Sequence, residues 1–379
     1  MYRFANMPGA LRHQCGAGGG GRLVIPERVL DAFGMSSSVD VKPMRGTKNQ
    51  NFRVMDENAG RTYVVRRRHS DYSGPEWVAF DHAAIRHLAQ RGAPVLSPIA
   101  AVNGVHAGRT WVVEEGSVYE AYPFVTGRPF DERSLRDVEQ VARGLAAVHR
   151  AGENFSGMFI KGRPRGEADP QRLFDSCDRL RADGGGVDAA VSYYERQIVA
   201  AAQCVPDERY GELARTLNHG DVHPGNVMMS PGGVTFVDYD WICRHPPIYD
   251  LAFALLFVCG DRAAPLQADD IWSLSQPFTL DVGKMAAFLT SYRAGLGAVA
   301  DPGGGKGNGG RGSGRQGDGG WSAGPPDLLV AQMRLTWVHC RVDGARKVEP
   351  ARRKEFLERD LETPFDALDA LPADLFAAR

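Results

Sequence analysis

The sequence has little that would direct the chain to a membrane, a zinc site or a disulfide framework. It contains no run of 18 or more apolar residues, so we expect no transmembrane helix. Its amino-terminal residues form no continuous apolar core, which argues against a signal peptide. The six cysteines are far apart and none forms a CxxC pair. We therefore expect a reduced, cytoplasmic protein.

The sequence also lacks an excess of charge of either sign. Lys and Arg total 45 against 46 Asp and Glu, which gives a net charge of -1. This balance offers no general basis for binding a nucleic acid polymer or an anionic membrane. The composition, 43% apolar and 24% charged, is typical of a globular protein. A length of 379 residues allows two domains or one bilobal unit, and the sequence leaves the oligomeric state open.

The sequence pattern predicts an α+β fold of two lobes. Residues 1–27 include the run GAGGGG and are expected to be a flexible segment. Residues 28–125 combine short β-branched runs with one amphipathic helix at 76–92, which predicts an antiparallel sheet carrying one helix. Residues 126–379 predict a mainly helical lobe, after a hinge near Pro123. Its helices are expected at about 135–152, 171–182, 188–205, 248–260, 282–297, 327–344 and 349–363.

A Gly-rich stretch, DPGGGKGNGGRGSGRQGDGG, interrupts the helical lobe at residues 301–320. A Gly-rich run binds phosphate when a strand leads into it and a helix begins directly after it. This stretch lies between two predicted helices and lacks that context. We therefore predict a disordered surface insertion at about 301–326.

Polar side chains are concentrated in one stretch, LNHGDVHPGNVMMSPGGVTFVDYDW, at residues 217–241. VMM and VTFV are short strands, and SPGG between them is a good turn. The resulting hairpin would bring Asp238 back beside the loop that holds Asp221 and Asn226. Phosphoryl transfer needs such a set, a carboxylate for the attacking hydroxyl and oxygen ligands for Mg²⁺ on the nucleotide phosphates.

The spacing matches the catalytic loop of kinases, in which His and Asp precede an Asn by a fixed interval. On this basis Asp221 is the candidate base, and Asn226 and Asp238 are the candidate metal ligands. Gly220 stands where protein kinases carry Arg, so we expect no activation-loop phosphorylation switch. Two alternatives remain, a polar turn lined by acids, and a metal site of His219, Asp221 and His223.

Three motifs, HGDVHPGNV, FVDYDW and PPIYDLAFAL, resemble the superfamily of aminoglycoside phosphotransferases, choline kinases and type II homoserine kinases. The resemblance implies a protein kinase-like fold from about residue 28 to the carboxyl end, apart from the Gly-rich insertion. It gives Asp240 the place of a second acid that assists at the metal or braces the loop. Asp250 would orient the catalytic loop, His219 would brace the backbone, and the role of His223 stays open.

The resemblance extends more weakly to the first lobe. GTKNQNFRV resembles the family's nucleotide loop, so Lys48 and Asn49 are expected near the phosphates. Arg66 stands where kinases carry a phosphate-pairing Lys, and Asp81 where a helix Glu pairs with it. Adenine would bond the backbone near Tyr122 to Phe124. The alternative is a solvated Arg66 on its strand and a solvated Asp81 on the polar face of the helix.

The sequence thus predicts an Mg²⁺-dependent phosphotransferase that moves the γ-phosphate of ATP (or GTP) to a hydroxyl of a small molecule. It favours an antibiotic of aminoglycoside or nucleoside type as acceptor, bound between the catalytic loop and the helices after residue 280. The alternatives are homoserine, another amino alcohol or a sugar, and a catalytically silent pseudokinase. A protein kinase is disfavoured because no APE-type segment follows VDYDW. The acidic residues after 349 would suit a polycationic acceptor, or form a solvated helix balanced by Arg and Lys.

Overall fold

The computed structural model describes residues 25–36, 38–44, 48–157, 161, 165–267, 270–297 and 326–376. The predicted flexible segment and Gly-rich insertion therefore lie almost entirely outside the described residues. The chain divides into two compact units, Met1–Gly74 with Pro98–Arg128, and Pro75–Ser97 with Pro129–Arg379. None of the described helices is both long enough and apolar enough to cross a membrane.

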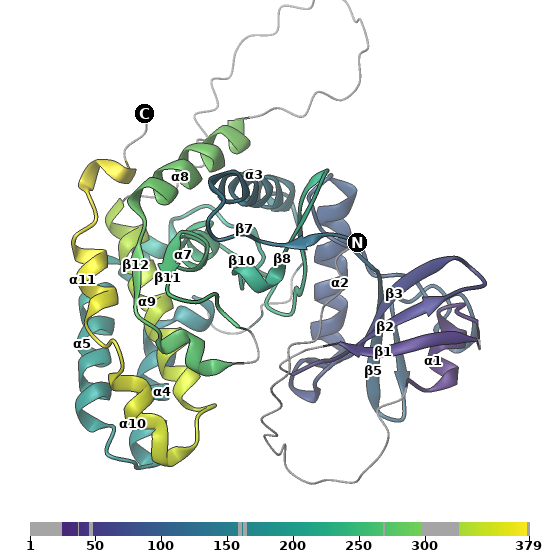
Figure 1. The fold of residues 1–379 in the computed structure, drawn as a ribbon, viewed down its shortest axis with the longest axis horizontal. Coiled ribbons are helices and arrows are strands. Elements are labelled where there is room, and N and C mark those ends of the chain that lie inside the picture. Colours follow the sequence, from purple (N-terminus) through teal and green to yellow (C-terminus); the bar gives the residue numbers. More distant parts are fainter. Residues whose placement is uncertain are drawn as a thin grey trace, which may run out of the picture. The chain divides into compact units, whose positions relative to one another are not determined.

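The first unit is built on a five-stranded antiparallel sheet in the order β1-β2-β3-β5-β4. The strands are β1 (Val39–Met44), β2 (Gln50–Asp56), β3 (Arg61–Arg67), β4 (Trp111–Glu114) and β5 (Ser117–Pro123). A short helix, α1 (Glu27–Ala32), adds Val29 to a core that contains Phe52, Val65 and Ala121 (Figure 1). The 3-10 turns η1 (Ser70–Tyr72) and η2 (Gly104–His106) complete the unit. The predicted antiparallel sheet is confirmed.

Helix α2 (Pro75–Gln90) was expected to accompany this sheet, but it is grouped with the second unit. Its apolar face, with Phe80, Ile85 and Leu88, belongs to the larger core that also holds Leu145. Helical spacing in a sequence shows that one face is buried. It does not show which part of the protein packs against that face. The sequence therefore placed α2 with the sheet, whereas the structure groups it with the second unit.

The second unit is mainly helical, as predicted. Its helices are α3 (Leu135–Gly152), α4 (Pro170–Ala182), α5 (Asp188–Cys204), α6 (Asp207–Gly211), α7 (Ile248–Phe257), α8 (Val282–Gly297), α9 (Pro326–Ala345), α10 (Arg353–Glu358) and α11 (Thr363–Asp369). In Figure 1, α3 and α8 lie side by side. The single terminal helix predicted at 349–363 is wrong. Asp360 has a φ of 52°, a left-handed conformation that interrupts a helix, and it separates α10 from α11.

Three small strand pairs complete the second unit. The hairpin β8 (Val227–Ser230) and β9 (Gly233–Phe236) is antiparallel, as are the pairs β7 (Thr216–Asn218) with β10 (Cys243–His245) and β11 (Gly260–Arg262) with β12 (Phe278–Leu280). The two-residue strand β6 (Arg128–Pro129) lies where the chain passes from one unit to the other. All ten residues of α7 are buried, so this helix is a fixed support for the segments around it.

Candidate active site

The catalytic loop lies between β7 and β8, and the predicted hairpin is confirmed. β8 and β9 pair from Val227 opposite Phe236 to Ser230 opposite Gly233. Directly after β9, the N–H of Val237 donates to the carbonyl of Asn226 at 3.0 Å. The chain that carries Asp238 therefore returns to the residues of the loop, as the spacing in the sequence predicted.

Asp221 and Asn226 are in direct contact. The side-chain Nδ2 of Asn226 donates to the carbonyl of Asp221 at 3.0 Å and to its carboxylate Oδ2 at 3.2 Å. Because this nitrogen faces Asp221, the amide oxygen of Asn226 is directed away from it. That oxygen and the carboxylate of Asp238 are hard oxygen donors of the kind that Mg²⁺ prefers, so the chemistry of these residues fits this ion.

Asp238 has an unusual backbone. Its φ is 63°, a left-handed conformation that costs a non-Gly residue on the order of 1–3 kcal/mol. Such a conformation persists only where the surroundings hold it, and it is common at functional sites. The backbone next to Asp238 is bonded to the loop, because the N–H of the preceding residue, Val237, donates to the carbonyl of Asn226.

Asp250 supports the backbone at the start of the catalytic loop. Its buried carboxylate accepts the N–H of His219 at 2.6 Å and the N–H of Gly220 at 2.8 Å. It also bonds Nε2 of His149 at 3.1 Å, and Nδ1 of His149 bonds the hydroxyl of Tyr292 at 2.7 Å. This geometry supports the predicted role of Asp250 in orienting the loop.

His219 is fully buried and both of its ring nitrogens bond to the backbone. Nδ1 accepts the N–H of Asp221 at 3.3 Å, and Nε2 lies 3.0 Å from the carbonyl of Val237. Burial lowers the pKa of His219, which favours the neutral ring that this arrangement needs. The geometry supports the bracing role. It speaks against the alternative metal site, because no ring nitrogen of His219 is left for an ion.

His223, whose role the sequence left open, has a partner in the structure. Its Nε2 lies 3.5 Å from Oδ2 of Asp221, and its Nδ1 accepts the N–H of Gly225 at 3.0 Å. Burial by itself lowers the pKa of His223, but the charge and hydrogen bond of Asp221 outweigh it and raise this pKa. In the same way burial raises the pKa of Asp221, and His223 outweighs it and lowers this pKa. Asp221 is thereby kept anionic, as a group that receives a hydroxyl proton must be.

Gly220 is required by close packing. Its φ is 89°, and a Cβ at this position would lie 2.1 Å from the carbonyl oxygen of Trp241. The catalytic loop and the segment after Asp238 therefore touch backbone to backbone here. Asp240, in the same segment, is buried, and its carbonyl accepts a hydrogen bond from Lys161, a residue that the sequence analysis missed.

In the first unit, Arg66 is buried against Glu120, a partner that was not predicted. Nε of Arg66 donates to Glu120 at 3.0 Å, and Arg68 donates to the other carboxylate oxygen at 2.6 Å. The hydroxyl of Tyr122 also donates to Glu120, at 3.3 Å. The alternative of a solvated Arg66 is therefore wrong, because its side chain is only 8% exposed.

Asp81, the predicted partner of Arg66, belongs to the second unit and forms an ion pair with Lys161 at 2.5 Å. The alternative of a solvated Asp81 is also wrong, because its side chain is 1% exposed. The structure thus gives Arg66 and Asp81 each a partner within its own unit. A pairing of the two with each other stays a prediction.

The other residues predicted to contact the nucleotide have hydrogen-bond partners within the first unit. Nζ of Lys48 donates to the hydroxyl of Tyr72 at 2.6 Å, and Asn49 accepts the N–H of His69 at 2.9 Å. Both residues thus fasten the loop to η1, while residues 45–47 lie outside the described residues. The N–H of Phe124 donates to the carbonyl of Thr62 at 3.1 Å, so it already has a partner.

Replacing Arg66 with Ala should raise the KM for ATP by about tenfold or more, because one charge-assisted bond contributes about 1.5–3 kcal/mol. The KM for the acceptor should change far less. Arg67→Ala is the matched control, since Arg67 is an exposed neighbour on the same strand, bonded to Ser117. Steady-state kinetics in both substrates measures this, and equal increases in the two KM values would contradict a nucleotide role for Arg66.

A second group of charged side chains lies on α9 and the 3-10 turn η3 (Gly166–Ala168). The ligand atoms of Glu167, His339 and Asp343 all lie within 4.8 Å of one another. Arg172 forms ion pairs with both carboxylates, at 2.7 Å to Asp343, and Nδ1 of His339 lies 2.8 Å from Asp343. Burial raises the pKa of Asp343, but His339 and Arg172 outweigh it and hold this pKa well below its usual range.

Two residues of this cluster, His339 and Asp343, belong to α9. This helix follows residue 280, where the acceptor was predicted. The second carboxylate oxygen of Asp343 is buried and has no hydrogen-bond partner among the residues that the structure describes. The cluster therefore contains one buried carboxylate oxygen whose hydrogen-bonding capacity is unused among the described residues, on a helix of the part of the chain where the acceptor was predicted.

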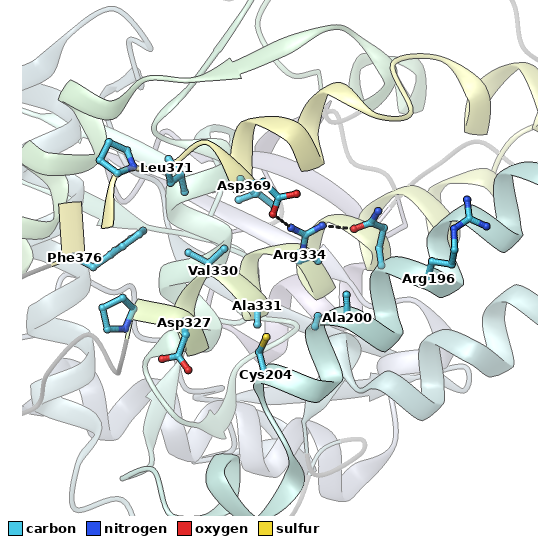
Figure 2. A pocket seen from close by; sticks show the side chains of 15 residues that line it. Arg196, Ala200, Cys204, Asp327, Val330, Ala331, Arg334, Asp369, Leu371 and Phe376 are labelled. Atoms are coloured by element: carbon cyan, nitrogen blue, oxygen red, sulfur yellow. Dashed lines mark hydrogen bonds and ion pairs between the residues drawn. The ribbon is translucent and has the colours of Figure 1, made fainter. Parts of the chain in front are cut away.

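A cavity of about 700 Å³ lies elsewhere in the second unit, between α5, the start of α9 and the segment after α11 (Figure 2). None of the predicted site residues lines it. Arg334 at its floor forms an ion pair with Asp369 and bonds Gln197. Two further terminal acidic residues are paired with neighbouring cations, Glu355 with Arg352 and Glu358 with Lys354. These pairings support a terminal segment whose acidic side chains are balanced by Arg and Lys, rather than a binding site for a polycationic acceptor.

Known proteins resemble this chain both in sequence and in fold. A model of the phosphotransferase enzyme family matches residues 40–285. The stress response kinase A of Escherichia coli K12 is 25% identical over 245 residues, which cover 63% of this chain and 69% of that protein. The protein called serine/threonine protein kinase RdoA in Salmonella typhimurium is 25% identical over 243 residues, with the same coverage.

Solved structures show the same fold. An aminoglycoside phosphotransferase from Alicyclobacillus acidocaldarius superposes with a TM-score of 0.62 and 16% identity over 94% of this chain and 98% of that one. A choline kinase from Cryptosporidium parvum gives 0.55 and 12%, over 88% and 91%. The family match covers well over half of the chain and includes the whole catalytic loop. The chain therefore belongs to the phosphotransferase enzyme family.

Proposed function

We propose that this protein transfers the γ-phosphoryl group of ATP (or GTP) to a hydroxyl of a small molecule that also carries an amine. The observation that carries the proposal is the arrangement of Asp221, held anionic by His223 and placed 3.2 Å from the amide nitrogen of Asn226. ATP as the donor implies that the protein works in the cytoplasm.

Each residue of the site has a distinct task. Asp221 accepts a hydrogen bond from the attacking hydroxyl, orients it and takes its proton as the bond to phosphorus forms. Asn226 and Asp238 would hold Mg²⁺, which when bound neutralises charge on the transferring phosphoryl group. Asp250 fixes the backbone before Asp221, so that the carboxylate is in place before the substrate binds. Most of the rate gain would come from this positioning and from charge stabilisation.

The amine follows from the cluster on α9. Asp343 stays anionic because its pKa is strongly lowered, and one of its buried oxygens lacks a hydrogen-bond partner among the described residues. An ammonium group on the acceptor would satisfy that oxygen. The similar folds include an aminopropanol kinase, whose named substrate carries an amine beside a hydroxyl, and a choline kinase, whose named substrate carries a quaternary ammonium group instead.

Amine-bearing acceptors include aminoglycoside antibiotics, homoserine and other amino alcohols. Of these we favour an aminoglycoside-type antibiotic, with homoserine or an amino alcohol as the alternative. A nucleoside antibiotic or a simple sugar fits the cluster only if it carries an amine. A catalytically silent pseudokinase is disfavoured because the candidate base, Asp221, and both candidate metal ligands, Asn226 and Asp238, are present in the sequence.

The test is an ADP-release screen in which each amine is matched to its hydroxy analogue, such as glucosamine with glucose and 1-amino-2-propanol with 1,2-propanediol. Aminoglycosides, nucleosides, homoserine and choline complete the panel, with protein acceptors as a separate class because one relative is called a protein kinase. We expect turnover of one amine and little turnover of its analogue. EDTA should abolish it, and mass spectrometry should locate the phosphate. Equal turnover of an amine and its hydroxy analogue would contradict the proposed amine on the acceptor. No turnover of any acceptor would contradict the proposed phosphotransferase activity.

Replacing Asp343 with Asn should raise the KM for the amine acceptor by about tenfold or more, because a charge-assisted hydrogen bond is lost. The KM for ATP should be unchanged. The control is Asp178→Asn, the same chemical change at a carboxylate whose side chain is 77% exposed on α4. An unchanged acceptor KM would place the amine site elsewhere.

A further inference from the structure

Lys161 is a buried cation with three defined neighbours. Its side chain is 4% exposed, and its Nζ lies 2.5 Å from a carboxylate oxygen of Asp81. The same ammonium donates to the carbonyl of Asp240 at 2.6 Å and lies 4.7 Å from the centre of the Trp77 ring. A buried charge is strongly unfavourable unless it is paired and hydrogen-bonded, and this one has an anion, a carbonyl and an aromatic face.

These contacts connect two separate parts of the second unit. Trp77 and Asp81 belong to α2, whereas Asp240 lies two residues after the proposed metal ligand Asp238. Lys161 comes from a third segment, between α3 and η3. One side chain thus fastens the backbone that follows Asp238 to the buried face of α2.

The segment around Asp238 needs such support. The left-handed backbone of Asp238 is unfavourable in itself, so residues on either side must hold it. Before Asp238, the N–H of Val237 is bound by the carbonyl of Asn226. After it, the carbonyl of Asp240 is bound by Lys161. The two bonds hold the segment at both ends and leave Asp238 little freedom to turn.

We propose that Lys161 is a positioning residue for phosphoryl transfer, which fixes the carboxylate of Asp238 through the backbone of Asp240. The inference rests on the proposed role of Asp238 at Mg²⁺. A displaced Asp238 would bind the ion more weakly, whereas the base Asp221 would keep its own contacts. Loss of Lys161 should therefore change the requirement for Mg²⁺ more than the maximal rate.

The test compares Lys161→Met, which keeps the length and removes the charge, with Lys161→Arg and wild type. The readout is ADP release from ATP, with water or the best acceptor of the panel, as a function of Mg²⁺ concentration. We expect Lys161→Met to raise the half-saturating Mg²⁺ concentration by about tenfold or more, equal to the loss of about 1.4 kcal/mol. Lys161→Arg, which keeps the cation, should recover much of that loss.

An unchanged Mg²⁺ requirement in Lys161→Met, with only a lower melting temperature, would show a packing role and overturn the inference. Asp81→Asn provides a second arm if Lys161→Met does not fold, because it weakens the anchor of the ammonium and keeps a polar side chain. It should shift the Mg²⁺ requirement in the same direction, and no shift would again overturn the inference. A wild-type protein that releases no ADP at any Mg²⁺ concentration would instead contradict the proposed function.

Discussion

Asp221→Asn should lower kcat by about 10²- to 10⁴-fold while leaving ATP binding nearly intact. The substitution keeps the shape of the side chain and the oxygen that accepts from Asn226, but it removes the negative charge. An amide cannot take the proton of the attacking hydroxyl, so the loss falls on the chemical step. ATP affinity, measured by titration of the protein with nucleotide and Mg²⁺, reports whether the rest of the site is unchanged.

The exposed Asp178→Asn variant serves as the control for the same change of charge and should keep the wild-type rate. The variants would be compared under saturating nucleotide and acceptor, so that only kcat is measured. Near-normal turnover in Asp221→Asn would rule out Asp221 as the base. The lowered pKa of Asp221 would then have no role in catalysis.

Asp250→Asn should have the largest effect on stability, and it should also reduce kcat. Its fully buried carboxylate bonds two backbone N–H groups and His149. An amide offers one oxygen in place of two, so at least one buried donor would face an NH₂ group. Leaving a buried donor unsatisfied costs about 1–3 kcal/mol.

Thermal unfolding measures this loss, and we expect Tm to fall by about 5 °C or more. The kcat of the folded variant, measured well below its Tm, reports the orientation of the loop separately. Asp178→Asn again provides the baseline for both quantities. A variant with wild-type Tm and wild-type kcat would show that Asp250 neither supports nor orients the catalytic loop.

Much of the fold and the centre of the site could be predicted from the sequence because the signals are local. The long helices α3, α8 and α9 were found close to their predicted bounds. The hairpin turn SPGG returned the chain to the catalytic loop, so the grouping of Asp221, Asn226 and the Asp238 segment followed from spacing. Such features depend on residues within about twenty positions of one another, which a single sequence displays.

The features that were missed are contacts between distant residues. Glu120 lies in β5, where a charged residue in the sequence suggests exposure, yet it is buried and pairs with Arg66 of β3 and with Arg68, which directly follows β3. Lys161 lies in a stretch without periodicity, and its partner Asp81 is 80 positions away. Charged side chains of this kind are found inside only when they are paired. A single sequence shows neither the pair nor the burial.

The packing at Gly220 has a consequence for how this protein can change over evolution. Any side chain there would collide with the backbone of Trp241, so Arg cannot be gained by one substitution. A phosphate-sensing Arg at this position is what links many protein kinases to upstream signals. Because of the backbone contact at Gly220, this chain cannot gain phosphorylation-dependent control through an Arg at that position. Ancestors and descendants with this loop would have to acquire phosphorylation-dependent control, if at all, from some other part of the molecule.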